Sequence, residues 1–153
     1  RAELWAPEEA ARRWLDALSL VRPGHPGLVV GRIPESLGQM LVRWSPTDYA
    51  QRLLDEREAL GFFPACTMVA LDGPPAQVRQ VADQVVREGG AELVGTVALP
   101  VTREGEERQV RTLVRTPLAD AATMLATLTD IRRSRAARKV APVKMSVNPP
   151  ELF

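Results

Sequence analysis

Residues 65–90 read ACTMVALDGPPAQVRQVADQVVREGG, and this stretch decides the fold class. Its first nine residues form a short apolar run, which is typical of a buried β-strand. After the two prolines, apolar residues recur at helical spacing on one face: Val78, Val81, Ala82, Val85 and Val86. Gly89 and Gly90 then predict the helix end. A strand followed at once by an amphipathic helix indicates a domain in which helices pack on a sheet.

Three further strands are predicted downstream. Residues 91–100 (AELVGTVALP) and 108–117 (RQVRTLVRTP) have strand composition, and residues 101–107 (VTREGEE) between them predict a hairpin loop. Residues 142–149 (PVKMSVNP) predict the last strand. The hairpin and the last strand are separated by a segment with helical spacing.

That segment, residues 116–133, predicts a helix that enters through Thr116 and Pro117. Its expected inward residues are Leu118, Ala121, Leu125 and Leu128. The resulting order is strand, helix, strand, strand, helix, strand. This order predicts an α+β domain of the ferredoxin-like (split βαβ) type, in which both helices cover one sheet face and the other face is open.

Alternation along the strand at 108–117 predicts which side chains occupy each face. Those expected under the helices are Val110, Thr112 and Val114. Those expected on the open face are Arg111, Leu113 and Arg115. Two interpretations of the two arginines stay open. They extend a basic surface together with Lys144, or they pair with the acids of the hairpin loop, which are Glu104, Glu106 and Glu107.

The first third of the chain predicts helices around one strand. A helix starts at Pro7 and ends before RPGHPG (22–27), and GLVVG (27–31) predicts a short buried strand. Residues 36–44 predict a second helix whose apolar stripe includes Trp44, which we expect in the core.

A third helix is predicted at residues 46–60, with Ser45 as its side-chain cap and Gly61 as its stop. Three charged residues near its end are expected to be surface ion-pair partners: Glu56, Arg57 and Glu58. The change of pattern near 62–64 predicts two domains, residues 1–63 and 64–153.

Composition excludes several classes of protein. Hydrophobic residues make up 45% and charged residues 25% of the 153 residues, which is typical of a globular chain. No run of about 18 apolar residues and no basic-then-apolar leader occurs, so we expect a cytoplasmic protein without a membrane contact. Cys66 is the only cysteine and is expected to be packed in the core. Because the chain begins with Arg1 in a helix-like stretch, we expect it to be a piece of a longer protein.

Positive charge is concentrated near the end. Residues 131–150 contain six Lys+Arg and no Asp+Glu, whereas the rest of the chain is slightly acidic. The cluster consists of Arg132, Arg133, Arg135, Arg138, Lys139 and Lys144. A polyanion such as DNA rewards clustered cations through counterion release. A solvated helix face is the alternative, although such faces normally mix both signs.

Catalytic patterns are absent from the sequence. His25 is the only histidine and lies in a Pro-Gly loop, and neither GxxxxGK[ST] nor GxGxxG occurs. An acylphosphatase-like site would need an arginine after the first strand, where the chain has Asp72. The predicted central strands also lack the aromatic residues on which bases stack, which favours contact with a nucleic-acid backbone.

Residues 41–75 (LVRWSPTDYAQRLLDEREALGFFPACTMVALDGPP) resemble the primosomal protein N′ family (PriA, the replication restart helicases). Matching positions in this stretch are Glu56, Arg57, Gly61 and Phe62. Further on, LVGTVALP is similar to the family's Leu-Gly-Pro-Val strand. Arg138, Lys139 and Val140, followed by VNP, are similar to its basic residues and terminal Val-Asp-Pro.

The resemblance implies that residues 1–63 end the second helicase lobe and that the rest is the C-terminal domain. It implies contact with forked or single-stranded DNA and a pocket for the acidic tail of single-stranded DNA-binding protein. It also implies that the ATP and zinc sites lie outside this chain, so no cofactor is expected in it. A ferredoxin-like RNA-binding or ribosome-associated module is the alternative, and a structural interaction domain is another.

Three departures from the family pattern stand out. Phe63 replaces a proline, and Asn148 replaces the acid of Val-Asp-Pro. Ala119 and Thr123 occupy the positions where some members have Arg and Gln for the tail pocket. Binding of that tail is therefore either lost or transferred to other groups such as Arg132 and Arg133.

The domain boundary gives the first testable prediction. A fragment of residues 64–153 should fold alone, because it has four predicted strands and two apolar helix faces. A fragment of residues 1–60 should not, because its single predicted strand has no partner for its backbone groups. Hydrogen exchange on the two fragments measures this. Strong protection in the isolated 1–60 fragment would show a self-sufficient domain and would contradict the expectation that these residues end a helicase lobe.

Overall fold

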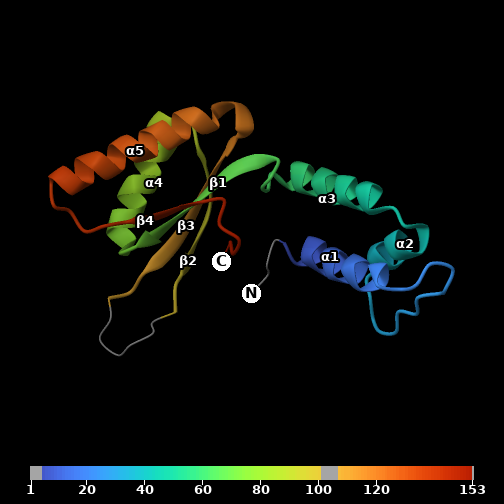
Figure 1. Ribbon diagram of the computed structural model, residues 1–153. Helices are drawn as coiled ribbons and strands as arrows, with labels where there is room; N and C mark the ends of the chain where they lie inside the picture. Colours follow the sequence, from blue (N-terminus) through green and yellow to red (C-terminus); the bar gives the residue numbers. More distant parts are fainter. Residues whose placement is uncertain (1–4, 101–106, 153) are drawn as a thin grey trace.

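The computed structural model describes residues 5–100 and 107–152. Its elements in chain order are α1 (Ala6–Ser19), α2 (Glu35–Arg43), α3 (Pro46–Leu60), β1 (Cys66–Gly73), α4 (Pro75–Gly89), β2 (Glu92–Ala98), β3 (Val110–Pro117), the 3₁₀ turn η1 (Leu118–Asp120), α5 (Ala121–Ala137) and β4 (Lys144–Val147). Figure 1 shows α1, α2 and α3 grouped on one side of the molecule and the sheet with α4 and α5 on the other. No described helix is long and apolar enough to cross a membrane.

The four strands form one antiparallel sheet in the order β2-β3-β1-β4. β1 lies between β3 and β4, so Val69 is opposite Val114 on one side and Val147 on the other. β2 and β3 pair as predicted for a hairpin, although most of the predicted loop, residues 101–106, lies outside the described residues. The architecture is α+β with a small antiparallel sheet and helices, and it is compatible with a ferredoxin-like fold.

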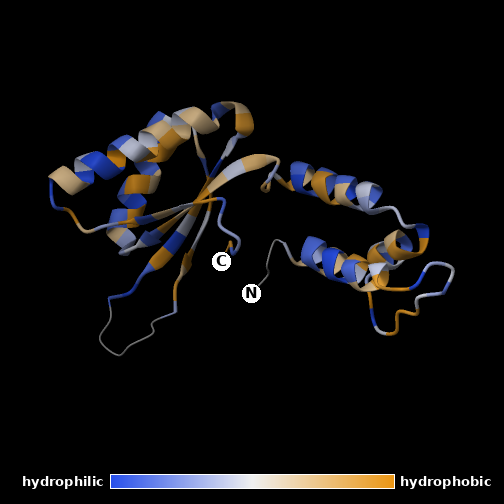
Figure 2. Ribbon diagram, viewed as in Figure 1, coloured by the Kyte–Doolittle hydropathy of each residue, from blue (hydrophilic) through white to orange (hydrophobic). Residues whose placement is uncertain are grey.

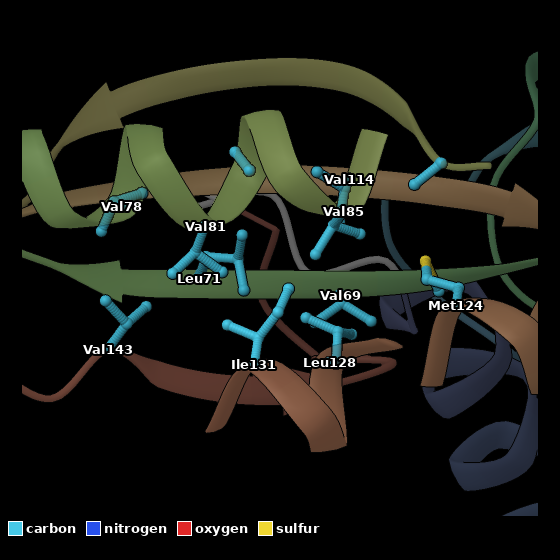
Figure 3. Close-up of a cluster of buried hydrophobic side chains, with 12 residues drawn as sticks. Val69, Leu71, Val78, Val81, Val85, Val114, Met124, Leu128, Ile131 and Val143 are labelled. Carbon is cyan, nitrogen blue, oxygen red and sulfur yellow. The ribbon is translucent and has the colours of Figure 1, made fainter. Parts of the chain in front are cut away.

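The main core lies between the sheet and the two helices α4 and α5 (Figure 3). β1 contributes Val69 and Leu71, and β3 contributes Val114. The helices contribute Val78, Val81, Ala82, Val85, Met124, Leu128 and Ile131. The predicted face of α4 is therefore confirmed except for Val86, which is 39% exposed.

The predicted inward face of α5 is confirmed at Leu128, which is buried, and Leu125 packs against the same core. Met124 and Ile131 are also buried there, whereas Leu118 is 58% exposed. Leu118 differs because it lies in the 3₁₀ turn η1 and the α-helix begins only at Ala121. Thr116 is a buried residue of β3 and not a helix cap.

The second sheet face is covered, although the sequence predicted an open one. Cys66, Met68, Ala70 and Leu113 are buried on it, as the alternation of β1 and β3 requires. None of the described helices contributes to this cluster; Phe62, Phe63 and Leu152 cover it, and Val94 of β2 packs beside them. The linker before β1 and the end of the chain thus replace a second helical layer.

The helices of the N-terminal part are confirmed, and they have a core of their own. Its buried residues are Ala11, Leu37, Met40, Leu41 and Tyr49. The predicted core position of Trp44 is wrong, because this residue is 55% exposed and ends α2 in a left-handed conformation with a φ of 53°. Ser45 precedes α3 but makes no side-chain capping hydrogen bond.

The strand predicted at residues 27–31 is also wrong. These residues form no strand, and Leu28 and Val30 are 88% and 79% exposed. The cause is the absence of a partner among the described residues, whose four strands all pair within the one sheet. Figure 2 shows the resulting apolar stretch in the loop between α1 and α2.

A buried arginine joins the helical part to the linker. Arg57 was expected on the surface, but it is 8% exposed and forms an ion pair with Glu8 of α1. Its guanidinium lies 5.1 Å from the centre of the Trp5 ring, and Trp5 packs edge-on against Phe63 with 5.2 Å between ring centres. Because Phe63 also covers the sheet, this contact connects the two parts of the chain.

The covered face predicts the effect of Leu113→Ala. Leu113 is fully buried, so the substitution should lower the free energy of unfolding by about 2–5 kcal/mol. The control is Leu93→Ala on the neighbouring strand, which should cost no more than about 1 kcal/mol because Leu93 is half exposed. Denaturant unfolding measures both. Equal small effects would mean that the second face is open to solvent.

Candidate nucleic-acid interface

The basic cluster lies at the C-terminal end of α5 and in the turn that follows. The Arg138 N–H donates to the Ser134 carbonyl at 3.1 Å, and the Val140 N–H donates to the Arg135 carbonyl at 3.2 Å. Between them, Lys139 has a φ of 52°, in the left-handed region that ends many helices. Positive side chains are favoured here because the exposed carbonyls form the negative end of the helix dipole.

Four members of the cluster are exposed and can reach a ligand. They are Arg132, Arg133, Arg138 and Lys139. Arg133 lies 3.7 Å from Asp130, but both side chains are 77% exposed, so this pair contributes little. The other three form no ion pair with the described residues. The end of α5 therefore presents an uncompensated positive surface, which we call the α5 patch.

Arg135 belongs to the same run but is held inside the domain. Its guanidinium donates to the Gln77 side chain at 2.7 Å, the Gln80 side chain at 3.3 Å and the Ala141 carbonyl at 2.7 Å. These contacts join α5 to α4 and to the segment before β4. Arg135 is thus separated from the α5 patch, although the sequence grouped them together.

Lys144 is also separated from the α5 patch. In the sheet it is opposite Asp72, which places it on the second face, whereas Met145 packs with the core under the helices. Lys144 is exposed there. The single basic surface that the sequence suggested is therefore divided between the two sides of the sheet.

Arg111 lies on the second face, as predicted, but it is not free. Its Nε and one terminal nitrogen each donate to the Asp72 carboxylate at 2.8 Å, and the other terminal nitrogen donates to the Glu151 carbonyl at 3.2 Å. The hydrogen bonds to Asp72 raise the pKa of Arg111 above its ordinary value. Both side chains are mostly buried, so this bidentate pair is part of the fold.

Arg115 is likewise paired, and with an acid that was not predicted. It donates to Glu92 at 2.9 and 3.2 Å and to the carbonyls of Leu60 and Gly61 at 3.0 and 3.1 Å. Gly61 has a φ of 64°, and a Cβ there would lie 2.5 Å from the Arg115 guanidinium, so a larger residue would be strained and would displace Arg115. Arg115 therefore fastens the end of α3 to the sheet.

Both arginines pair with acids, but the partners that the structure shows are not those of the hairpin loop. Their partners are Asp72 and Glu92, each directly opposite on the neighbouring strand. Glu107 is not a partner, and Glu104 and Glu106 lie outside the described residues. These pairs can be predicted only when the register between neighbouring strands is known. The hydrophobic pattern of the sequence did not determine that register.

The departures from the family pattern have distinct structural roles. The Asn148 side-chain oxygen accepts from the Met68 N–H at 3.0 Å, and its own N–H donates to the Met68 carbonyl at 2.8 Å. An aspartate could accept the same bond, so this exchange preserves the contact. Ala119 and Thr123 are exposed near the start of α5, next to the acidic Asp120. Thr123 lies roughly 13 Å from Arg132 along the helix, at about 1.5 Å per residue, and Ala119 lies farther away.

The remaining candidate groups have ordinary structural environments. Burial raises the pKa of the Cys66 thiol, which donates to the Gly61 carbonyl at 3.0 Å. Within residues 5–100 and 107–152, no three His, Cys, Asp or Glu side chains are grouped to hold a metal ion. The α5 patch is the feature that suggests a ligand, and that ligand is anionic.

This geometry defines the class of the protein: a small α+β domain with a positive patch at the end of a helix. Sequence comparison matches residues 58–150 to the primosomal protein N C-terminal domain, and the chain belongs to this family. It is 33% identical over 122 residues to the probable replication restart protein PriA of Mycobacterium leprae, covering 78% of this chain and 18% of that protein. It is 36% identical over 107 residues to the protein of that name from Mycobacterium tuberculosis, covering 65% and 16%.

The chain thus spans less than a fifth of the length of these relatives. Among solved structures, a DUF3240 family protein from Shewanella baltica aligns with a TM-score of 0.36 and 18% identity, covering 57% of this chain and 91% of that one. This likeness is too distant to assign a fold.

The Arg115–Glu92 pair predicts a change in an acid titration. Hydrogen bonds from Arg115 lower the pKa of Glu92 below its ordinary value of 4.5. A carboxyl with a lowered pKa in the folded state contributes stability above the unfolded pKa, and this contribution is lost as the pH falls through the folded pKa. Arg115→Gln should therefore raise the pKa of Glu92 toward 4.5 and remove the contribution of Glu92 to the pH dependence of stability.

Carboxyl titration by NMR measures the shift. Glu9 is the internal control, because its pKa of about 2 depends on Arg12 and Arg13 and should not move. An unchanged Glu92 titration in the variant would contradict the pairing.

Proposed function

We propose that this chain is a DNA-binding C-terminal portion of a replication restart protein that acts in the cytoplasm. The family match and the printed names of the two relatives support the replication role. The α5 patch is the observation that carries DNA binding, because it is exposed, positive and without compensating acids other than Asp130. Its long side chains can approach phosphates from the surface of the domain.

The expected contact is with the nucleic-acid backbone. Phosphate contacts position a protein on DNA but carry no sequence information, so binding should be weak and independent of sequence. The covered second face supports this mode, since Phe62, Phe63 and Leu152 occupy the place where bases would stack. Forked or single-stranded DNA is the proposed substrate.

The proposal also assigns residues 1–63 to the end of a helicase lobe. Leu28 and Val30 are exposed between α1 and α2, and such an apolar stretch is expected where a segment packs against another part of a longer protein. The much greater length of the relatives supports this origin. The helicase activity itself would belong to the longer protein.

A contact with the acidic tail of single-stranded DNA-binding protein would use the same α5 patch. The first turn of α5 offers Ala119 and Thr123, which carry no charge, next to the negative Asp120. The proposal therefore assigns this partner to Arg132 and Arg133, in competition with DNA.

Salt-dependent DNA binding tests the proposal. The probe is a fluorescent forked duplex, and the measurement is anisotropy over a series of salt concentrations. The logarithm of the binding constant should fall by about 0.9 per log unit of salt for each phosphate contacted on duplex DNA. Replacing Arg132, Arg133 and Arg138 with Ala should weaken binding to all sequences alike and reduce this slope.

The matched control removes three exposed arginines from the helical part: Arg22, Arg32 and Arg43. It lowers the net charge equally and should leave the salt slope unchanged. Equal losses in both triple variants would show a general effect of net charge. A flat salt response, or a preference for structured RNA over forked DNA, would count against the proposed function.

A further inference from the structure

Arg135 differs from its basic neighbours in how its guanidinium is used. The terminal nitrogens donate to Gln77, Gln80 and Ala141, and the buried Nε has no hydrogen-bond partner. Its side chain is half-buried, whereas Arg132 and Arg138 are exposed. Three of the five N–H donors of this guanidinium are used inside the domain and the Nε donor is buried, which leaves one N–H of Nη1 for a phosphate.

The same residue holds the following turn at two points. The backbone carbonyl of Arg135 accepts the Val140 N–H at 3.2 Å, and its side chain donates to the Ala141 carbonyl at 2.7 Å. Arg138 and Lys139 lie in the turn between α5 and these two contacts. The orientation of both cations therefore depends on the hydrogen bonds that Arg135 makes with Val140 and Ala141.

The turn has a backbone conformation that needs such support. Lys139 has a φ of 52°, a left-handed backbone conformation that destabilises residues other than glycine. The hydrogen bonds around Arg135 offset this destabilisation. Without them, the turn would relax to conformations in which Arg138 and Lys139 no longer act together.

We infer that Arg135 is the positioning residue of the DNA-binding turn and does not contact phosphate. This inference rests on the proposed function, and it defines the binding element more narrowly as the end of α5 together with the turn at 138–141. For this role the shape of the Arg135 side chain matters more than its charge. Only a planar guanidinium, with several N–H donors, can bond to α4 and to the turn at the same time.

Three single variants of the full chain test the inference by anisotropy with the forked duplex. Arg135→Lys keeps the positive charge but removes the guanidinium. It should weaken DNA binding roughly threefold to tenfold, because the turn must then be ordered on binding. The salt slope should stay unchanged. Gln77→Ala removes a partner on α4 without altering any charge and should act in the same direction. Lys139→Gly removes a charge but suits the left-handed backbone, and its salt slope should fall by about 0.9.

Hydrogen exchange on the free protein supplies a readout that does not depend on DNA. Amides 138–141 should exchange faster in Arg135→Lys and Gln77→Ala but not in Lys139→Gly, while the amides of β1 stay protected in all three. Binding of Arg135→Lys equal to that of the unmodified chain, or a reduced salt slope in it, would overturn the inference. So would unchanged exchange at 138–141.

Failure of the proposed function would look different. In that case the unmodified chain itself would not bind the duplex, or would bind without salt dependence. Exchange at 138–141 would still report whether Arg135 holds the turn.

Discussion

The structure depends on the burial of β1 on both of its faces. Every residue from Cys66 to Gly73 is buried, although helices cover only one side of the sheet. The other side is covered by Phe62, Phe63 and Leu152, which come from the linker before β1 and from the end of the chain. Removing apolar area from water on both sides of the central strand thus fixes the positions of segments that are distant in sequence.

This constraint also divides the positive charges. Arg111 and Arg115 lie on the covered face, where a free guanidinium would be costly, and each is paired with a carboxylate on the adjacent strand. Arg135 is used to hold α4, α5 and the next turn together. The four exposed cations of the α5 patch have no such structural task, and this difference makes the patch the candidate for DNA binding.

The order and type of the main elements could be predicted from the sequence, because Val78, Val81 and Val85 repeat with helical spacing and the strands alternate. The strand at 27–31 was wrong since composition alone does not supply a pairing partner. On α5, Leu128 was predicted correctly, whereas Leu118 was wrong because it lies in the 3₁₀ turn before the helix begins. The roles of Arg111, Arg115 and Arg135 depend on register and tertiary contacts, which local pattern does not determine.

We propose that DNA contacts the end of α5 and not the sheet. Amide chemical shifts of the isotope-labelled chain, recorded as forked DNA is added, distinguish the two surfaces. Changes should be concentrated at residues 132–141, with little change along β1 and β3. Changes concentrated on β1, β3 and Phe62–Phe63 would contradict it, because they would place the nucleic acid on the covered face.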